Sequence, residues 1–500
     1  MAYQRPGVYV QETLNPIAPV VGPSSDSVAA FVGANDRGPT RPTLVTSWSQ
    51  YVTQFGSWNT TASNNLPIAV YLFFANGGSQ AYVTRVVGSS AAAATRTLTD
   101  RAATPLSTLV VAAKNQGTWG NNLNISIVDS TVAGLFDLII YEGGNTTANI
   151  VERFTDLSMI STNSRYAIPT VNALSNYVVL TDSLSATAGN NKNPSVITNQ
   201  ALATGANGSA ITSSNINTAL ALYDTISQSL VLNVAGYTDA TVVNLAISYA
   251  EGRDDVFVVV DGAVDTVANQ ITLAASYTSS SLAAVYYPQI IISDPTLGLG
   301  ASSATTTTVG AGGAIIGLIA STDASRGVFK APAGLTARIA GAVAVPALTN
   351  AELDSLNAAG APVNAIRFIS GSGIVVMGSR TIKAGYVDRY VPVRRSLIYL
   401  RKAMVDLTQF AIFEPNDPGL WRRIDSALSG FLTNFWSQGG LRGNTPAEAF
   451  FVKVDAENNT QATIDNGEVH IEIGVALQRP AEFIIIKIGQ FDGGTTVTVA

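Results

Sequence analysis

A strand-like segment stands at each end of this chain, and neither has an obvious partner strand nearby in the sequence. The first covers residues 5–12, and the prolines among residues 6–23 favour an extended path. The last covers residues 495–499, which are all β-branched and follow a turn at 492–494. A five-residue strand is not stable alone, and a free strand edge recruits other chains. The sequence therefore predicts polymerisation by strand exchange between copies, through Val8, Tyr9, Val10, Thr496, Val497, Thr498 and Val499.

The composition favours self-assembly as well. The chain has 500 residues, enough for roughly three domains of about 150 residues each. Apolar residues make up 47% of it and charged residues only 12%, whereas the usual charged fraction is ~25%. So little charge indicates that other copies cover much of the surface. A large neutral surface rich in Ala, Thr and Ser is the alternative.

The pattern along the chain predicts a multidomain protein of mixed α+β and α/β class. Strands and helices alternate before residue 99 and again after residue 237. Between these points the chain is rich in Asn, Ser, Thr and Gly, with short alternating strands. We expect an N-terminal exchange arm (1–22), a discontinuous α/β domain (23–98 and 238–340), a β-rich insertion (99–237), a C-terminal α+β domain (341–489) and a C-terminal exchange arm (490–500).

Capping signals place the main helices. Capping boxes open short helices at Ser47 and Thr349. Two long helices are expected at 393–411 and 418–438, and strands near 449–454, 468–476 and 482–488 should form a sheet with one polar face. The stretch from 298 to 313 is expected to be a flexible loop.

The chain lacks the residues that most catalytic and metal sites need. It has no cysteine and one histidine, His470, which we expect on the polar face of a strand. No phosphate-binding loop or nucleophile elbow is present, so we expect no catalytic site, metal or cofactor. A catalytic α/β enzyme with a β insertion is the alternative, and it would need a convergent polar pocket. No run approaches the ~18 apolar residues of a membrane span, and no signal peptide opens the chain. We therefore expect cytoplasmic synthesis without membrane insertion.

One stretch is strongly basic. Residues 380–423 hold nine basic and four acidic residues, a local charge of +5, which leaves −11 for the rest of this −6 chain. Leu397, Leu400, Met404 and Leu407 form the expected core stripe of the helix at 393–411. Apolar residues within the opposite basic face indicate a contact with an acidic partner, whereas a solvated helix face is the plainer alternative. Nucleic acid is disfavoured because the chain is acidic overall. The expected contact residues are Arg394, Arg395, Ile398, Arg401, Lys402 and Val405.

A series of short motifs resembles the contractile tail sheath proteins of phages and phage-like injection machines. The resemblance covers residues 1–98 and roughly 330–490, and the order of the motifs carries it. They are Pro6-Gly7-Val8-Tyr9-Val10-Gln11-Glu12, Phe31-Val32-Gly33, Arg37-Gly38-Pro39, Phe73-Phe74-Ala75-Asn76-Gly77-Gly78, Tyr82-Val83-Thr84-Arg85-Val86, Trp119-Gly120-Asn121-Asn122-Leu123, Gly378-Ser379-Arg380-Thr381, Val391-Pro392-Val393-Arg394-Arg395, Phe413-Glu414-Pro415-Asn416, Leu420-Trp421, Gly439-Gly440-Leu441-Arg442-Gly443 and Pro480-Ala481-Glu482-Phe483.

The resemblance implies a structural subunit that polymerises helically around an inner tube and contracts to drive the tube through a cell envelope. It implies arms exchanged between neighbours, each adding a strand to another subunit's C-terminal sheet, with that domain against the tube and the insertion outward. The implied partners are further copies in stacked hexameric rings, the inner tail tube protein, and baseplate and tail terminator proteins. The implied location is the virion tail, assembled in the host bacterial cytoplasm. A static helical tube or shell, or the sheath of a non-viral injection system or bacteriocin, stays open.

Overall fold

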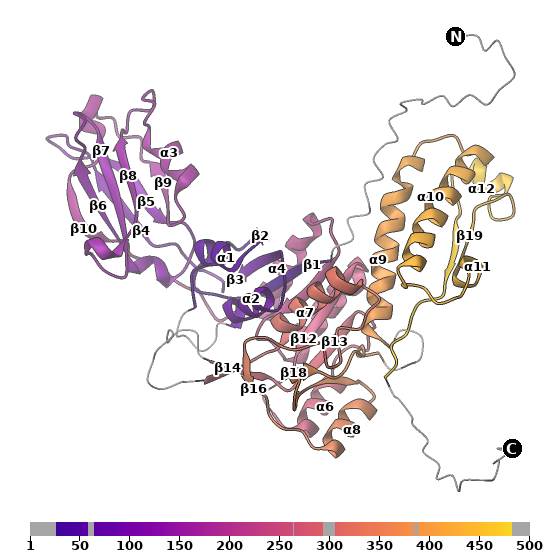
Figure 1. Cartoon of the computed structure of the whole chain (residues 1–500). Helices are drawn as coiled ribbons and strands as arrows, with labels where there is room; N and C mark the ends of the chain where they lie inside the picture. The colour runs from indigo at the N-terminus through magenta and orange to yellow at the C-terminus, as the bar shows by residue number, and fades with distance from the viewer. Residues whose placement is uncertain are drawn as a thin grey trace, which may run out of the picture.

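The computed structural model describes residues 27–58, 65–263, 265–293, 306–383, 385 and 389–482. Three bodies follow one another across the molecule: a β-rich body, a central α/β body and a largely helical C-terminal domain (Figure 1). The expected mixed α/β architecture with several sheets is confirmed. Within the ranges described here, no helix has the length and apolar character needed to cross a membrane.

The central body is built on an eight-stranded sheet in the order β18-β17-β13-β12-β11-β1-β3-β2. The strands from β17 to β3 pair in parallel, as their buried Val, Ile and Ala runs favour, and the edge strands β18 and β2 are antiparallel. The strands are β1 Val28–Ala34, β2 Thr43–Val45, β3 Ala81–Val86, β11 Leu230–Val234, β12 Val256–Asp261, β13 Ala283–Tyr287, β17 Val363–Ile369 and β18 Gly373–Val376.

Two helix pairs pack on this sheet, α2 with α7 and α4 with α5. The α2–α7 contact is close because Gly313 has no side chain: a Cβ there would lie 2.0 Å from the carbonyl oxygen of Ala69. Ser47 and Thr349 are the N-caps of α1 and α8, as predicted. Thr349 forms the complete capping box with Glu352, whereas the side chain of Gln50 accepts from the N–H of Thr46 rather than from that of Ser47. The helices of the central body are α1 Trp48–Phe55, α2 Asn65–Ala75, α4 Ser213–Ala221, α5 Ala240–Arg253, α6 Val267–Ala275, α7 Gly312–Arg326 and α8 Asn350–Ala358.

The borders of the central body differ from the sequence-based expectation. Strand β11 lies within the range expected for the insertion, and β17 and β18 lie within the range expected for the C-terminal domain, yet all three join the main sheet.

The prediction of a flexible loop at 298–313 is wrong for the described residues of this range, because Thr306–Val309 forms β15 and α7 begins at Gly312. Threonine is β-branched and suits a strand once a partner is present. That partner is β14, Ile290–Ser293, which also pairs with β16, Ala342–Ala344.

The β-rich body contains two antiparallel sheets around a core of its own. One sheet has the order β4-β5-β9 and the other the order β10-β6-β7-β8. Its elements are β4 Thr95–Thr99, β5 Ser107–Ala113, β6 Leu123–Asp129, β7 Phe136–Glu142, β8 Ile150–Leu157, α3 Ala167–Leu174, β9 Val178–Asp182 and β10 Ile197–Ala201. Short 3-10 turns in the chain include η1 Thr118–Asn122, η2 Thr147–Asn149, η3 Gly189–Lys192, η4 Leu222–Thr225 and η6 Gln409–Ala411.

Two buried arginines join the β-rich body to the central body. The Arg37 guanidinium lies 5.0 Å from the ring centroid of Trp119 and 4.1 Å from that of Tyr177. Arg85 donates 2.6 Å hydrogen bonds to the carbonyl oxygens of Asn35 and Gln116, and burial lowers its pKa to about 10. Three motifs that the sequence showed only as separate stretches therefore meet at one junction.

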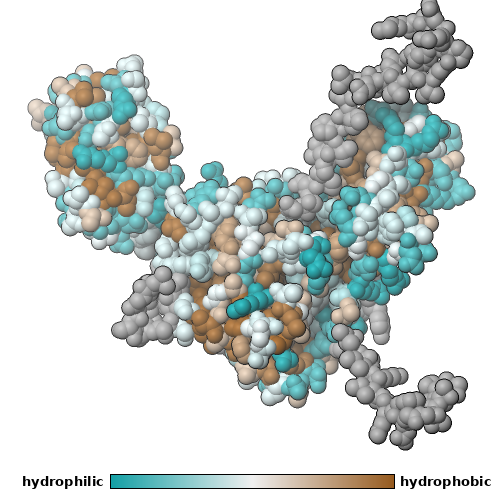
Figure 2. Space-filling model, viewed as in Figure 1, coloured by the Kyte–Doolittle hydropathy of each residue, from teal (hydrophilic) through white to brown (hydrophobic). Residues whose placement is uncertain are grey.

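The C-terminal domain packs two long antiparallel helices against a two-stranded sheet, with helix α9 beside the central body (Figure 1). Both helices were predicted from the sequence, and Asp417 caps the second by accepting a 2.7 Å hydrogen bond from the N–H of Leu420. Figure 2 shows this domain as mostly hydrophilic on the visible face. Its elements are α9 Val391–Thr408, α10 Pro418–Ser437, α11 Pro446–Ala449, β19 Phe450–Lys453, α12 Gln461–Asp465 and β20 Glu472–Val475.

Candidate functional site

Helix α9 is buried along two different faces. Near its N-terminus, Val391 and Ile398 join the core of the central body. Further along, Leu400 packs with Leu432 and Phe435 of α10 in a separate core. The helix therefore belongs to both bodies, and its two halves turn different sides to solvent.

This double burial corrects part of the predicted contact surface. Arg395 is 2% exposed and makes two hydrogen bonds to the Asp323 carboxylate of α7, with Nη1 2.8 Å from Oδ1. Ile398 is 4% exposed. Both side chains were expected on an outward basic face, which assumed a single buried stripe along the helix. They are instead covered by the central body.

The remaining predicted residues of this helix are more accessible. Arg401 forms an exposed ion pair with Asp254 at the C-terminal end of α5 (2.9 Å), and Lys402 pairs with Asp406 one turn along α9 (3.4 Å). Val405 is half exposed and Arg394 is partly buried. Their contact with a tube stays a prediction.

The two-stranded sheet of this domain has open edges in the described structure. The register pairs Phe450 with Val475, and the N–H of Ala476 donates to the carbonyl oxygen of Ala449 (2.8 Å). Inward and outward backbone groups alternate along antiparallel strands. The N–H and C=O groups of Val475 on β20, and of Val452 on β19, therefore point away from the partner strand. Among the described residues no third strand pairs with either edge, so the sheet is a template for added strands.

The arm residues expected to use such edges lie outside the described residues. These are Val8, Tyr9, Val10, Thr496, Val497, Thr498 and Val499. The strand expected near 482–488 also lies almost wholly outside them. Strand exchange therefore stays a prediction.

The described part of the chain holds no group of three or more His, Cys, Asp or Glu side chains placed to bind a metal ion. His470 lies just before β20 and is exposed, with Nε2 3.0 Å from Oε2 of Glu468. The backbone of His470 is held by the side chain of Asn459. The His470 N–H donates to Oδ1 of Asn459, and Nδ2 of Asn459 donates to the His470 carbonyl oxygen. This geometry is that of a surface residue next to a sheet.

Comparison with known proteins relates this domain to a family. Residues 389–491 match the family described as "Phage tail sheath C-terminal domain". The resemblance to contractile tail sheath proteins is confirmed. Over 180 residues, or 35% of its length, this chain is 32% identical to the tail sheath protein of Vibrio phage KVP40. The chain spans about a quarter of the length of this curated sheath relative.

Solved sheath structures share the fold of nearly the whole chain. The sheath of PVC, an extracellular contractile injection system, in its contracted state is 23% identical, with a TM-score of 0.58 over 98% of both chains. The contracted helical sheath of the anti-feeding prophage is also 23% identical, with a TM-score of 0.58 over 98% of this chain and 100% of that one. The sheath tail protein of Listeria innocua is 14% identical, with a TM-score of 0.61 over 90% of this chain and 96% of that one. At these identities the comparison establishes a common sheath fold.

Proposed function

We propose that this chain is the structural subunit of a contractile tail sheath, which polymerises helically around an inner tube and shortens to drive that tube through a cell envelope. The observation that carries the proposal is the match of residues 389–491 to the sheath C-terminal domain family. The sheath fold of nearly the whole chain supports it. Contraction on this proposal is rigid-body rotation of subunits that stay joined by their arms, released from an extended state that is kinetically trapped.

The test is the length of the polymer before and after a trigger. Particles containing the full chain on its tube are imaged by electron microscopy, then exposed to low pH or urea and imaged again. The sheath is expected to become shorter and wider while its subunits stay connected. A polymer that keeps its length would support a static tube or shell and contradict the proposal.

The chain has two predicted terminal arms, and its C-terminal sheet has two open edges that could each receive one arm. We assign one arm of a neighbour to the outer edge of β19 and another to the outer edge of β20. A strand of about three residues would add only a few hydrogen bonds of ~1 kcal/mol each. Repeated at every subunit, these bonds hold a mesh together while the bodies rotate.

The tube contact is assigned to the exposed side of α9, around Arg401, Lys402 and Val405. Arg401→Glu reverses a charge without touching a core, and we expect it to lower co-sedimentation of the sheath with tube at least tenfold. Arg153→Glu is the matched control, because this exposed arginine also pairs with an aspartate but lies on the β-rich body. Equal tube binding by both variants would show that the exposed side of α9 does not contact the tube.

The other partners follow from the same assignment. The chain would meet a baseplate at one end of the polymer and a terminator at the other, within a virion or a phage-like particle. A non-viral injection system or a bacteriocin would use the same subunit chemistry. On this proposal the β-rich body lies on the outside of the polymer, away from the tube.

A further inference from the structure

The turn between α9 and α10 presents a group of apolar side chains to solvent. We call Phe410, Ile412 and Phe413 the α9–α10 knob; they are 43%, 65% and 102% exposed. Phe413 also has a positive φ of 64°. A bulky residue in this conformation is strained, and such strain is retained where it serves a function. The knob is therefore a candidate contact for another protein surface.

The turn that carries the knob is firmly held. Asn416 accepts a 2.8 Å hydrogen bond from the Trp421 indole N–H and donates a 2.9 Å bond to the carbonyl oxygen of Glu468. Glu414, next to Phe413, pairs with Arg423 at 2.8 Å. The knob is preorganised, so little ordering free energy opposes its insertion into a partner.

A cavity of about 440 Å³ lies near the N-terminal end of α9, between the central body and the C-terminal domain. Its apolar lining includes Phe329, Met377 and Tyr390, and it is within the size range that holds a ligand or a few side chains. Ser379 also lines it; the residue is 7% exposed, and its hydroxyl oxygen is closed to solvent.

Two basic residues, Lys330 and Arg479, line the cavity, and neither forms an ion pair with another described residue. The carboxylate of the lining residue Glu482 already pairs with Arg380 at 2.7 Å and accepts a hydrogen bond from Tyr390. Burial, together with this hydrogen bond, raises the pKa of Tyr390. An incoming acidic group would therefore meet Lys330 and Arg479.

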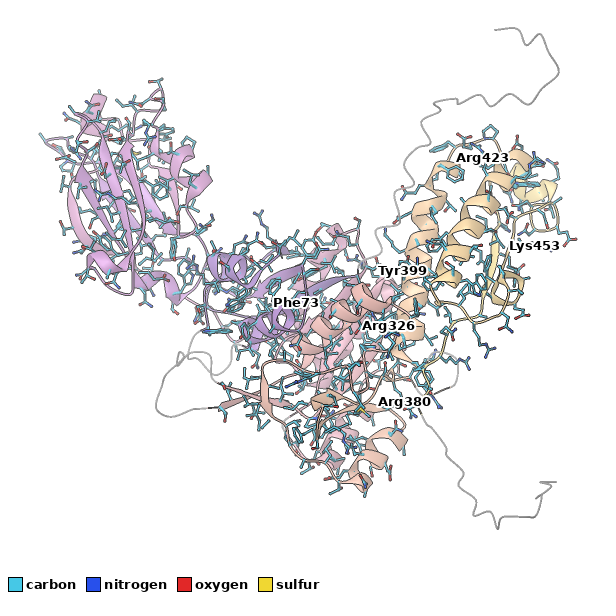
Figure 3. The ribbon with its side chains drawn as sticks, in the orientation of Figure 1. Phe73, Arg326, Arg380, Tyr399, Arg423 and Lys453 are labelled. Carbon is cyan, nitrogen blue, oxygen red and sulfur yellow. The ribbon has the colours of Figure 1, made fainter. Side chains whose placement is uncertain are left out.

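We propose that the α9–α10 knob of one copy inserts into this cavity of a second copy. Phe413 would fill the apolar part, and Glu414 would exchange its exposed ion pair with Arg423 for contacts with Lys330 and Arg479. Figure 3 shows Arg423, which pairs with Glu414, at one end of the domain and Arg380, next to the cavity residue Ser379, towards the other. The 18-residue helix α9 separates the two ends by about 27 Å. Contacts between two different surfaces are head-to-tail, and they build rings or helical polymers rather than two-fold symmetric dimers. This inference rests on the proposed function.

The absence of cysteine from the chain makes a direct test possible. Phe413→Cys and a tagged Ala333→Cys, whose site lines the cavity, are mixed as full chains, assembled and mildly oxidised. We expect a disulfide between the two variants, because it forms only where Cα atoms come within about 7 Å. Leu184→Cys, an exposed site on the β-rich body, replaces Phe413→Cys as the control and should give no such product.

A second measurement tests the energetic role of the knob. Phe413→Ala should raise the concentration needed for polymerisation at least tenfold, as expected for an aromatic anchor of an interface. The melting temperature should not change, because this side chain contacts solvent only. Leu184→Ala should change neither quantity.

The outcomes separate this inference from the proposed function. Polymers without the expected disulfide, or a Phe413→Cys chain that crosslinks to a tube protein instead, would overturn the inference and leave the sheath proposal standing. An unaltered chain that forms no polymer would overturn both.

Discussion

Deletion of residues 1–12 should leave a folded chain that no longer forms long polymers. The deleted segment holds the predicted strand of the N-terminal exchange arm, and every residue that the structure describes lies beyond it. The cores of the three bodies are built from residues 28 onward, so the melting temperature should stay close to that of the full chain. Sedimentation velocity measures the polymer, and circular dichroism the fold. Long tubes formed by the truncated chain would contradict the arm assignment.

The outer edge of β20, which is proposed to receive an arm, can be tested by removing one backbone hydrogen-bond donor. Val475→Pro removes an N–H that points away from β19 and leaves the β19–β20 ladder in place. The residue before it is Gly474, which tolerates the restriction that proline imposes on its neighbour. Val475→Ala loses similar packing but keeps the N–H. We expect Val475→Pro to polymerise at least tenfold more weakly than Val475→Ala, and equal behaviour would show that this edge receives no strand.

Replacing Arg395 should cost far more stability than replacing Arg401, although both arginines lie on α9 and both pair with an aspartate. The Arg395 side chain is 2% exposed and its partner Asp323 is 22% exposed. Arg395→Met would leave this carboxylate without its charged partner, which costs about 3–5 kcal/mol when a buried pair is broken. The expected result is a clearly lower urea midpoint for the transition that unfolds the central body.

Arg401→Met is the matched control for this prediction. Its pair with Asp254 is about half exposed on both sides, and exposed pairs contribute roughly 0–1 kcal/mol. The urea midpoint should therefore change little. Equal shifts for Arg395→Met and Arg401→Met would show that the Arg395–Asp323 pair does not tie α9 to the central body.

The predicted elements differ in how local their signals are. Helix α10 was predicted because its cap, its first proline and its apolar stripe all lie within the residues that form it. Helix α7 was missed, since Gly312, Gly313 and Gly317 argue against a helix in isolation. Those glycines become favourable only against α2, where a Cβ at Gly317 would lie 2.5 Å from the carbonyl oxygen of Phe73.

The predicted contact surface shows the same limit. Helical periodicity correctly placed Leu400 in a core, but it assigned Arg395 and Ile398 to the outer face. A single helical period predicts one buried stripe along a helix, whereas α9 packs against two bodies and is buried on two faces. Similarly, the sequence contained Arg37, Arg85 and Trp119 as separate motifs, and only the fold brings them to one junction.

The sequence by itself determined the mixed α/β class of the protein, the capped helices α1, α8 and α10, and the resemblance to sheath proteins, because caps, turns and ordered motifs are local properties. Only the tertiary structure decided which arginines of α9 are covered, which edges of the C-terminal sheet are open, and that an apolar knob and a cavity lie near opposite ends of α9. These depend on contacts between residues far apart in the chain, and the strength of such contacts is set by burial and geometry rather than by neighbouring residues.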